Sequence, residues 1–205
     1  MIQLPSKIVC VGKNYLDHAK EMGGGELPTD PLLFLKPSSS IIGPGEPIVL
    51  PRLSTHVDHE AEIGIVIKDR LRKVSEAEAM RGIAGFVCLN DVSARDWQKR
   101  ESQWARAKGF DTFCPVGDSV VAGLDWRDLE VIGRVNGQVR QHGKARDMLY
   151  GIPFLLSHIS HVMTLEPGDL IATGTPAGVG RLNPGDIVEV EIPGVGVLRN
   201  PVVAE

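Results

Sequence analysis

Two glutamates stand where a charged segment enters an apolar run, in HVDHEAEIGIVI over residues 56–67. Side chains alternate faces along a strand, so the carboxylates of Glu60 and Glu62 would share one face, roughly 7 Å apart. If that face meets water, their repulsion is small and screened by salt. If the face is buried, a cation between the carboxylates would account for the pair. The segment alone leaves both alternatives open.

A third carboxylate follows a second apolar run, IAGFVCLN over residues 83–90. Asp91 would stand at the end of a buried strand, which is a common way to hold a functional group on a rigid element. Alternatively, Asn90 and Asp91 only form a turn. If Asp91 lies beside Glu60 and Glu62, the three side chains offer oxygen ligands without sulfur or imidazole. Such a set suits a hard cation, above all Mg²⁺.

The composition is that of an ordinary globular protein, and it excludes several classes of function. The 205 residues carry a net charge of -4, and no basic cluster predicts a nucleic-acid partner. No apolar run approaches the length of about 18 residues that a membrane span needs, and no signal peptide is evident. Three widely spaced cysteines without a CxxC pair fit a reducing compartment. We therefore expect a cytoplasmic protein with neither a nucleic-acid nor a membrane partner.

Glycine and proline separate many short apolar runs, which predicts a mostly β protein with a few short helices, of the α+β class. The runs that predict strands span residues 7–11, 31–36, 47–50, 62–67, 83–90, 129–136, 168–174, 186–192 and 196–203. Asn136-Gly137 predicts a two-residue hairpin turn. Helices are expected over residues 14–24, after a capping box that begins at Ser75, and over residues 153–163. We expect one catalytic domain over residues 1–205.

Six blocks along the chain resemble the fumarylacetoacetate hydrolase family. They are VGKNYLDHAKEMG (11–23), LFLKPSSSIIGPG (33–45), DHEAEIGIVI (58–67), LNDVSARDWQ (89–98), KGFDTFCPVGD (108–118) and TGTPAGVG (173–180). The blocks run in order over essentially the whole chain. The likeness is closest to the short, single-domain branch of acylpyruvate hydrolases and oxaloacetate decarboxylases. The resemblance implies mixed β-sheets rolled into a barrel-like fold, assembled as a homodimer.

The resemblance also implies a metal site. The matching acidic positions of the family bind a divalent metal, which makes Glu60, Glu62 and Asp91 the expected ligands. The expected ion is Mg²⁺, with Mn²⁺ or Ca²⁺ as further candidates. This favours the buried alternative for the two glutamates, because they can share one cation.

Four further residues match substrate-handling positions of the family. Lys108 matches an active-site lysine, although without the motif it would be read as a solvated surface lysine. Arg95 and Gln98 are three residues apart on a predicted short helix and so share a face. They match positions that close over the carboxylate end of the substrate. Thr175, in TGTP, resembles a threonine that contacts this carboxylate.

His18 and Glu21 form the last candidate pair. Three residues apart on the helix expected over 14–24, they would lie on one face, where a carboxylate can orient an imidazole. Taken alone, the charged neighbours Asp17 and Lys20 favour an ordinary surface helix. The family's YxDHxxE block carries a histidine–glutamate dyad that activates water, so the resemblance implies this role for His18 and Glu21.

Together these residues predict a divalent-metal-dependent hydrolase that cleaves a C–C bond in acylpyruvates such as fumarylpyruvate or acetylpyruvate. The partner is then a small 2-oxo acid, which chelates a metal through its carboxylate and keto oxygens. Oxaloacetate decarboxylation passes through the same enolate and is expected as a further activity. The alternative is an isomerase or tautomerase of 2-hydroxy-dienoates or oxaloacetate. A metal-binding scaffold without turnover is disfavoured, because the catalytic residues are intact.

Two departures from the family pattern bear on the substrate. Residues 99–104, where family members carry a mobile lid, form a short segment here, which leaves the length of the substrate open. We also expect the chain to lack the additional N-terminal domain of the larger members.

Overall fold

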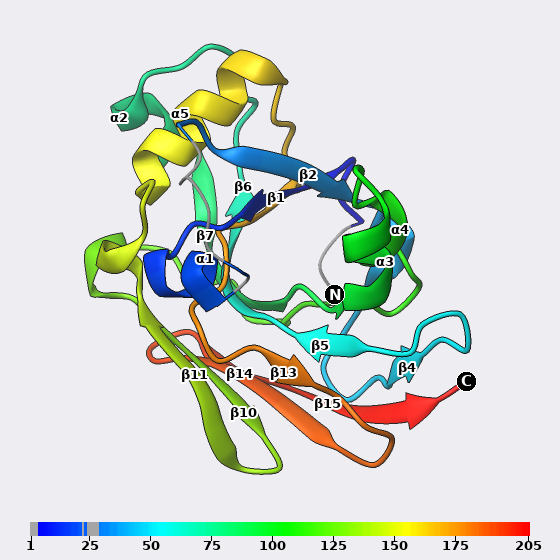
Figure 1. The fold of residues 1–205 in the computed structure, drawn as a ribbon. Helices are drawn as coiled ribbons and strands as arrows, with labels where there is room; N and C mark the ends of the chain where they lie inside the picture. Colours follow the sequence, from blue (N-terminus) through cyan, green and yellow to red (C-terminus); the bar gives the residue numbers. More distant parts are fainter. Residues whose placement is uncertain (1–3, 22, 24–28) are drawn as a thin grey trace.

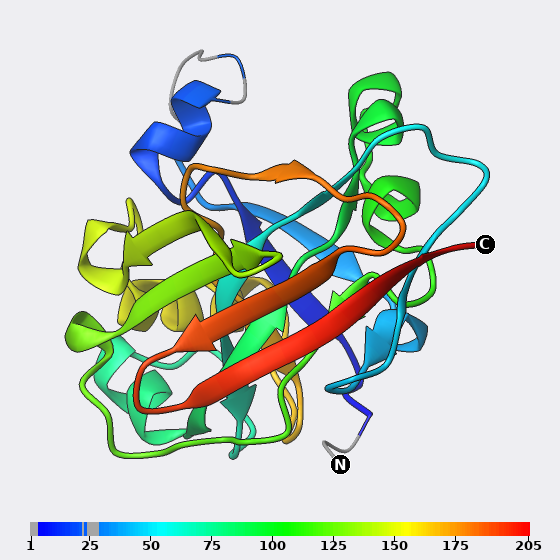
Figure 2. The same cartoon turned by 90° about the horizontal axis from the view of Figure 1, so that it is seen from below.

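Two open five-stranded sheets carry most of the fold, which the computed structural model describes over residues 4–21, 23 and 29–205 (Figure 1). The first sheet has the order β2 (Leu32–Lys36), β1 (Ile8–Gly12), β12 (Leu170–Ala172), β6 (Ala61–Ile67) and β7 (Ile83–Asn90). The second has the order β11 (Gln138–Lys144), β10 (Glu130–Val135), β14 (Ile187–Ile192), β15 (Gly196–Ala204) and β4 (Ile48–Leu50). Strands β10 and β14 lie against β6 and β7, so the two sheets pack on each other (Figure 2).

Shorter elements join these sheets. One small sheet contains β13 (Gly180–Arg181), β5 (Val57–His59) and β8 (Ser93–Ala94), and another pairs β3 (Ile41–Ile42) with β9 (Cys114–Pro115). The α-helices are α1 (Leu16–Glu21), α2 (Glu76–Arg81), α3 (Arg95–Arg100), α4 (Ala105–Lys108) and α5 (Ile152–Val162). Three 3₁₀ turns span Ser38–Ser40, Trp126–Asp128 and Ala145–Asp147. Within the described ranges, none of the helices has the length and apolarity that crossing a bilayer requires.

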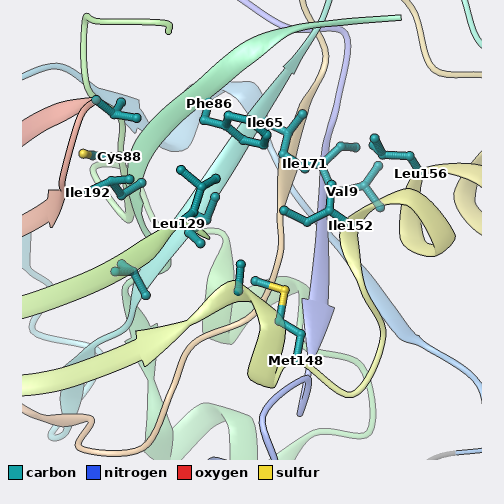
Figure 3. Close-up of a cluster of buried hydrophobic side chains, with 14 of the residues drawn as sticks. Val9, Ile65, Phe86, Cys88, Leu129, Met148, Ile152, Leu156, Ile171 and Ile192 are labelled. Carbon is teal, nitrogen blue, oxygen red and sulfur yellow. The ribbon is translucent and has the colours of Figure 1, made fainter. Parts of the chain in front are cut away.

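Strand β6 is buried on both faces, and its two faces serve different purposes. Ile65 points into the larger hydrophobic core, which it shares with Ile152 and Leu156 of α5 (Figure 3). Ile63 belongs to the same core. Glu62 lies on the opposite face, because side chains alternate along a strand. The predicted alternation is therefore present, and the hydrophobic core fixes the direction in which Glu62 points.

The predicted strands are all present, and the largest shift is two residues at each end of β12. The hairpin turn is also confirmed, since Asn136 and Gly137 have φ values of 53° and 76°, as a type I′ turn requires. The predicted helix over 14–24 is shorter than expected within the described residues. The helix begins at Leu16. Asn14 lies before it, and its side chain hydrogen-bonds to the backbone of Tyr150 and Thr173.

The expected barrel closure is wrong for the part of the chain that the structure describes. The first sheet ends at β2 and β7, and no ladder joins these edge strands. Segment 116–121 occupies the outer edge of β7 instead. The N–H groups of Phe86 and Val121 donate to each other's carbonyls over 2.9 and 3.0 Å, and Gly117 donates to Cys88 over 2.8 Å. An edge covered in this way has fewer free backbone groups with which to close a sheet.

Candidate active site

Glu60, Glu62 and Asp91 meet where β6 begins and β7 ends. The two strands are antiparallel neighbours that pair Ala61 with Asn90, so the start of β6 lies beside the residue that follows β7. The N–H of Asp91 donates to the carbonyl of Glu60 over 2.9 Å. One carboxylate oxygen from each acidic residue lies within 4.8 Å of the others, and no more than 4% of any of these residues is exposed. The alternative in which the two glutamates face water is therefore wrong.

Two buried lysines hold the same carboxylates. Nζ of Lys108 lies 2.7 Å from Oε2 of Glu60 and 2.5 Å from Oδ2 of Asp91. Nζ of Lys36 donates to Oδ1 of Asp91 over 2.6 Å and to the carbonyl of Val92 over 3.1 Å. Lys108 is thus no solvated surface lysine. Lys36 is a site residue that the sequence analysis does not single out. Its only signal is a charge that ends the apolar run PLLFLK, as Asp91 ends IAGFVCLN.

Arg95, at the start of α3, holds side chains that already belong to the site. Its Nε lies 2.7 Å from Oδ2 of Asp58, and its Nη2 lies 2.6 Å from Oε1 of Glu60. Its Nη1 donates to Oε1 of Gln98 over 2.8 Å. Through this ion pair and this hydrogen bond Arg95 positions Glu60 and Gln98, and the amide nitrogen of Gln98 remains able to donate to a ligand. The shared face predicted for Arg95 and Gln98 is present.

The buried cluster contains more negative than positive groups. Its four carboxylates belong to Asp58, Glu60, Glu62 and Asp91, and its three cations to Lys36, Arg95 and Lys108. Burial opposes ionisation of Glu60, but Lys108, Arg95 and His18 nevertheless hold its pKa below the usual value. Three cations cannot neutralise four carboxylates, so one negative charge of the cluster remains uncompensated.

Glu62 is the carboxylate without a cationic partner at ion-pair distance among the described residues. Burial, Asp91 and Glu60 raise its pKa well above the usual value. Its Oε2 accepts from the N–H of Gly174 over 2.8 Å. A divalent ion would supply the missing positive charge, and the cluster offers the carboxylate oxygens that a hard cation prefers. The residues present therefore fit a divalent metal.

His18 and Glu21 form a hydrogen-bonded pair on α1. Nδ1 of His18 lies 3.1 Å from Oε2 of Glu21, and the N–H of Gly178 lies 3.1 and 3.3 Å from the two carboxylate oxygens. A Cβ at position 178 would lie 1.9 Å from the carbonyl oxygen of Arg140, so glycine is needed for this approach. His18 itself is buried. With Nδ1 toward Glu21, the Nε2 edge of its ring is available to a molecule in the cavity.

Thr175 follows β12, and the buried side-chain amide of Gln141 hydrogen-bonds to its hydroxyl. Oγ1 of Thr175 donates to the carbonyl of Ala61 over 2.9 Å and accepts from Nε2 of Gln141 over 2.6 Å. Oε1 of Gln141 accepts from the N–H of Ala61 over 2.9 Å and lies 2.9 Å from Nδ1 of His59. Gln141 thereby ties β11 to the start of β6. Gln141 has no signal in the sequence, because no local pattern marks its burial.

One cavity of about 210 Å³ brings the candidate residues together, and residues of α1, α3 and α4 line it. Its wall includes His18, Glu60, Glu62, Asp91, Arg95, Gln98, Lys108 and Thr175, whereas Glu21 lies behind His18. Phe34 and Trp104 add an apolar wall, with ring centroids 5.2 Å apart. Drug-sized ligands take about 300–1,000 Å³, so this cavity suits a small molecule.

Comparison with known proteins places these residues in a family. Residues 7–203 match the family model described as fumarylacetoacetate (FAA) hydrolase C-terminal. This chain belongs to the fumarylacetoacetate hydrolase family. The resemblance stated from the six sequence blocks is thereby confirmed. Members of the fumarylacetoacetate hydrolase family use a metal, and the buried acidic triad of this chain could bind a divalent ion.

Relatives within the fumarylacetoacetate hydrolase family have different names. A solved structure described as 2-hydroxyhepta-2,4-diene-1,7-dioate isomerase from Mycobacterium marinum is 50% identical with a TM-score of 0.91, covering 98% of this chain and 76% of that one. The 2,4-didehydro-3-deoxy-L-rhamnonate hydrolase of Sphingomonas sp. is 45% identical, over 96% of this chain and 73% of its own length. The mitochondrial oxaloacetate tautomerase of Homo sapiens is 43% identical, over 97% of this chain and 67% of its own length. The family therefore includes hydrolases, isomerases and tautomerases.

Proposed function

We propose that this protein is a divalent-metal-dependent hydrolase that cleaves acylpyruvates into pyruvate and a carboxylic acid. The observation that carries the proposal is the His18–Glu21 pair, which reaches the same cavity as the buried carboxylates. Decarboxylation of a 2-oxo acid needs groups that stabilise an enolate. Hydrolysis also needs a group that takes a proton from water, and His18 supplies it.

Different residues of the cavity have different roles in this reaction. A divalent ion held by Glu60, Glu62 and Asp91 would act as a Lewis acid on the keto oxygen of a bound 2-oxo acid. Nε2 of His18 accepts a proton from water, and Glu21 stabilises the resulting imidazolium through Nδ1. The water oxygen attacks the distal carbonyl carbon, and the bond to the neighbouring methylene carbon breaks. Its electron pair stays with the pyruvate part as an enolate, which takes the proton back from His18.

Lys108 stabilises negative charge that develops on the substrate. An ammonium group has three N–H donors, and two of those on Lys108 are engaged by Glu60 and Asp91. The third can donate to a substrate oxygen. Because Lys108 is buried, such a hydrogen bond would be stronger than in water.

An isomerase or tautomerase of 2-oxo acids is the second candidate. His18 could take a proton from carbon and return it elsewhere on the same substrate, with no water consumed. Relatives named oxaloacetate tautomerase and 2-hydroxyhepta-2,4-diene-1,7-dioate isomerase favour this candidate. Oxaloacetate decarboxylation is a further proposed activity, because its bond cleavage also needs no water.

We further propose a homodimer as the working form, as the family resemblance implies. Several large apolar side chains of the described residues are more than a third exposed, and those of Leu16, Leu149 and Phe154 are among them. Leu149 lies close to α1, because its N–H donates to the carbonyl of Asn14 over 2.8 Å. A second copy of the chain could cover such a surface. Sedimentation equilibrium tests this, and a monomer at micromolar concentration would contradict it.

The activity is tested with acetylpyruvate and protein stripped of metal by a chelator and dialysis. Loss of the ultraviolet absorbance of the substrate reports consumption, and separate assays of pyruvate and acetate report cleavage. We expect no cleavage without metal and stoichiometric release of both products after Mg²⁺ or Mn²⁺ is added. An absorbance change without pyruvate would favour the tautomerase. Full activity in excess chelator would contradict both candidates.

A further inference from the structure

Two lysines in the cavity wall differ from the other cations there. Lys13 directly follows β1, Lys99 lies on α3, and both line the cavity that holds the carboxylates. Arg95 and Lys108 are already bound to Glu60. Among the residues that the structure describes, by contrast, the side chains of Lys13 and Lys99 form no ion pair or hydrogen bond. Their positive charges remain available to a ligand.

Helix α3 places Lys99 at the outer end of the cavity. Residues four apart on a helix share a face and lie about 6 Å apart along its axis, so Lys99 stands one turn beyond Arg95. Arg95 reaches inward to Glu60 and is buried, Gln98 is half-buried, and Lys99 is exposed. The cavity therefore runs from the buried carboxylates, past the amide of Gln98, to the ammonium of Lys99.

Lys13 borders the same opening from the end of β1. Its φ of 56° is a left-handed conformation that few residues other than glycine adopt, and it turns the chain sharply at the cavity. The preceding Gly12 lies against the indole of Trp104, so closely that a Cβ at position 12 would come within 3.0 Å of the ring. This contact joins the end of β1 to the segment that follows α3. Lys13 and Lys99 thus stand beside one apolar wall.

The distribution of charge indicates what this opening binds. With a divalent ion present, the buried cluster would have one positive charge in excess, which matches the single carboxylate of a 2-oxo acid. Lys13 and Lys99 add positive charge at the outer end, where an acyl chain of the substrate would lie. A methyl group there gains nothing from the lysines, whereas a second carboxylate can form charge-assisted hydrogen bonds with both.

We propose that Lys13 and Lys99 select 2-oxo acids that carry a second carboxylate at the end remote from the keto acid group. They bind this carboxylate at the outer end of the cavity. The inference rests on the proposed function for the orientation of the substrate, with its keto acid group toward Glu60, Glu62 and Asp91. Lys13 and Lys99 are then the residues that set specificity for the acyl group.

Binding of two unreactive ligands tests this without turnover. The ligands 2-oxopentanedioate and 2-oxopentanoate have the same carbon chain and differ only in a terminal carboxylate or methyl group. Titration calorimetry with Mg²⁺-loaded protein should show tighter binding of the dicarboxylate. Lys13→Gln and Lys99→Gln should each weaken that binding by about 3- to 5-fold, and change binding of the monocarboxylate by less than about 2-fold. Lys73→Gln is the matched control, because Lys73 is exposed, has a φ of 53° and lies outside the cavity wall.

Three results would overturn the inference. They are equal affinity for the two ligands, no binding of the dicarboxylate, and equal losses for both ligands in the two variants, which would indicate unspecific attraction of anions. The outcome is separable from the proposed function. A selective loss in a protein that does not cleave acetylpyruvate supports the role of Lys13 and Lys99 and contradicts only the hydrolase. Cleavage without any selective loss contradicts only the role of the two lysines.

Discussion

Replacing Glu62 with glutamine tests the electrostatic account of the carboxylate cluster. Glutamine keeps the length of the side chain and leaves an oxygen that can accept from the N–H of Gly174, which lies 2.8 Å away in the native protein. The substitution removes one negative charge from a site where Glu60 and Asp91 offer oxygens within 4.8 Å. We expect Glu62→Gln to bind Mg²⁺ more weakly and, without metal, to be more stable than the native protein.

The size of the gain in stability follows from the distances. Two unit charges 4.8 Å apart repel each other by about 3.5 kcal/mol at an effective dielectric constant of about 20. Protonation limits the penalty, since protonating a glutamate of ordinary pKa, about 4.3, at pH 7 costs about 3.7 kcal/mol. Lys108 attracts Glu62 and offsets part of the repulsion from Asp91 and Glu60. We therefore expect metal-free Glu62→Gln to gain about 1–3 kcal/mol in unfolding free energy at pH 7.

The sign of the pH dependence follows from the raised pKa of Glu62 in the folded protein. The penalty is present at neutral pH and disappears as the pH falls below about 4.3, where Glu62 is protonated in both the folded and the unfolded protein. Urea unfolding in excess EDTA at pH 7 and pH 4 measures both values. Glu76→Gln, at an exposed position on α2, is the matched control and should change the unfolding free energy by about 0.5 kcal/mol or less.

Two outcomes would refute this reasoning. A Glu62→Gln variant that is no more stable than the native protein at pH 7 would show that neighbouring charges do not destabilise Glu62. A gain of the same size at pH 4 would assign the effect to packing. Separately, an unchanged Mg²⁺ affinity in titration calorimetry would remove Glu62 from the predicted metal ligands.

Three further substitutions test other parts of the site. His18→Ala in Mg²⁺-loaded protein should lower acylpyruvate hydrolysis by at least about 100-fold and oxaloacetate decarboxylation much less, because only hydrolysis needs a base for water. Pyruvate release from each substrate measures both rates, and equal losses in the two reactions would contradict that role of His18. Lys36→Met should reduce the unfolding free energy in EDTA by about 3–5 kcal/mol, because it removes a buried cation from Asp91; a loss below about 1 kcal/mol would be inconsistent with a buried ion pair. Gln141→Leu should cost about 2–4 kcal/mol in the same assay, since several buried polar groups lose their partner, whereas the exposed control Gln138→Leu on the same strand should cost little.

The strands could be predicted because each is encoded locally. An apolar run bounded by glycine or proline defines β6 or β7 without reference to the rest of the chain. Closure of the sheet could not be predicted in this way. It depends on pairings between distant segments, such as Ile8 with Leu170 in the parallel pair of β1 and β12, and on the segment that covers the edge of β7. No local sequence pattern predicts the pairing of β1 with β12 or the covering of the β7 edge.

The acidic residues of the site could be predicted from the sequence, whereas most of the residues that hydrogen-bond to them or hold neighbouring groups could not. Glu60 and Glu62 carry their own signal, since two like charges at the start of an apolar strand need an explanation. Lys36 and Gln141 look like surface residues in the sequence. Their burial depends on partners far along the chain, and Lys36 pairs with Asp91, 55 residues away. A residue such as Glu62 can therefore be predicted from its neighbours in the sequence, whereas Lys36 and Gln141 become site residues only through contacts that the fold creates.

The central claim is that Glu60, Glu62 and Asp91 hold one divalent cation. Its most direct test is a crystal of the protein soaked in Mn²⁺, with anomalous diffraction recorded near the manganese absorption edge. We predict one strong anomalous peak bonded to an oxygen from each of the three carboxylates, and its loss in a Glu62→Gln crystal soaked in the same way. An ordered Mn²⁺ elsewhere on the protein, with no peak between these carboxylates, would contradict the claim.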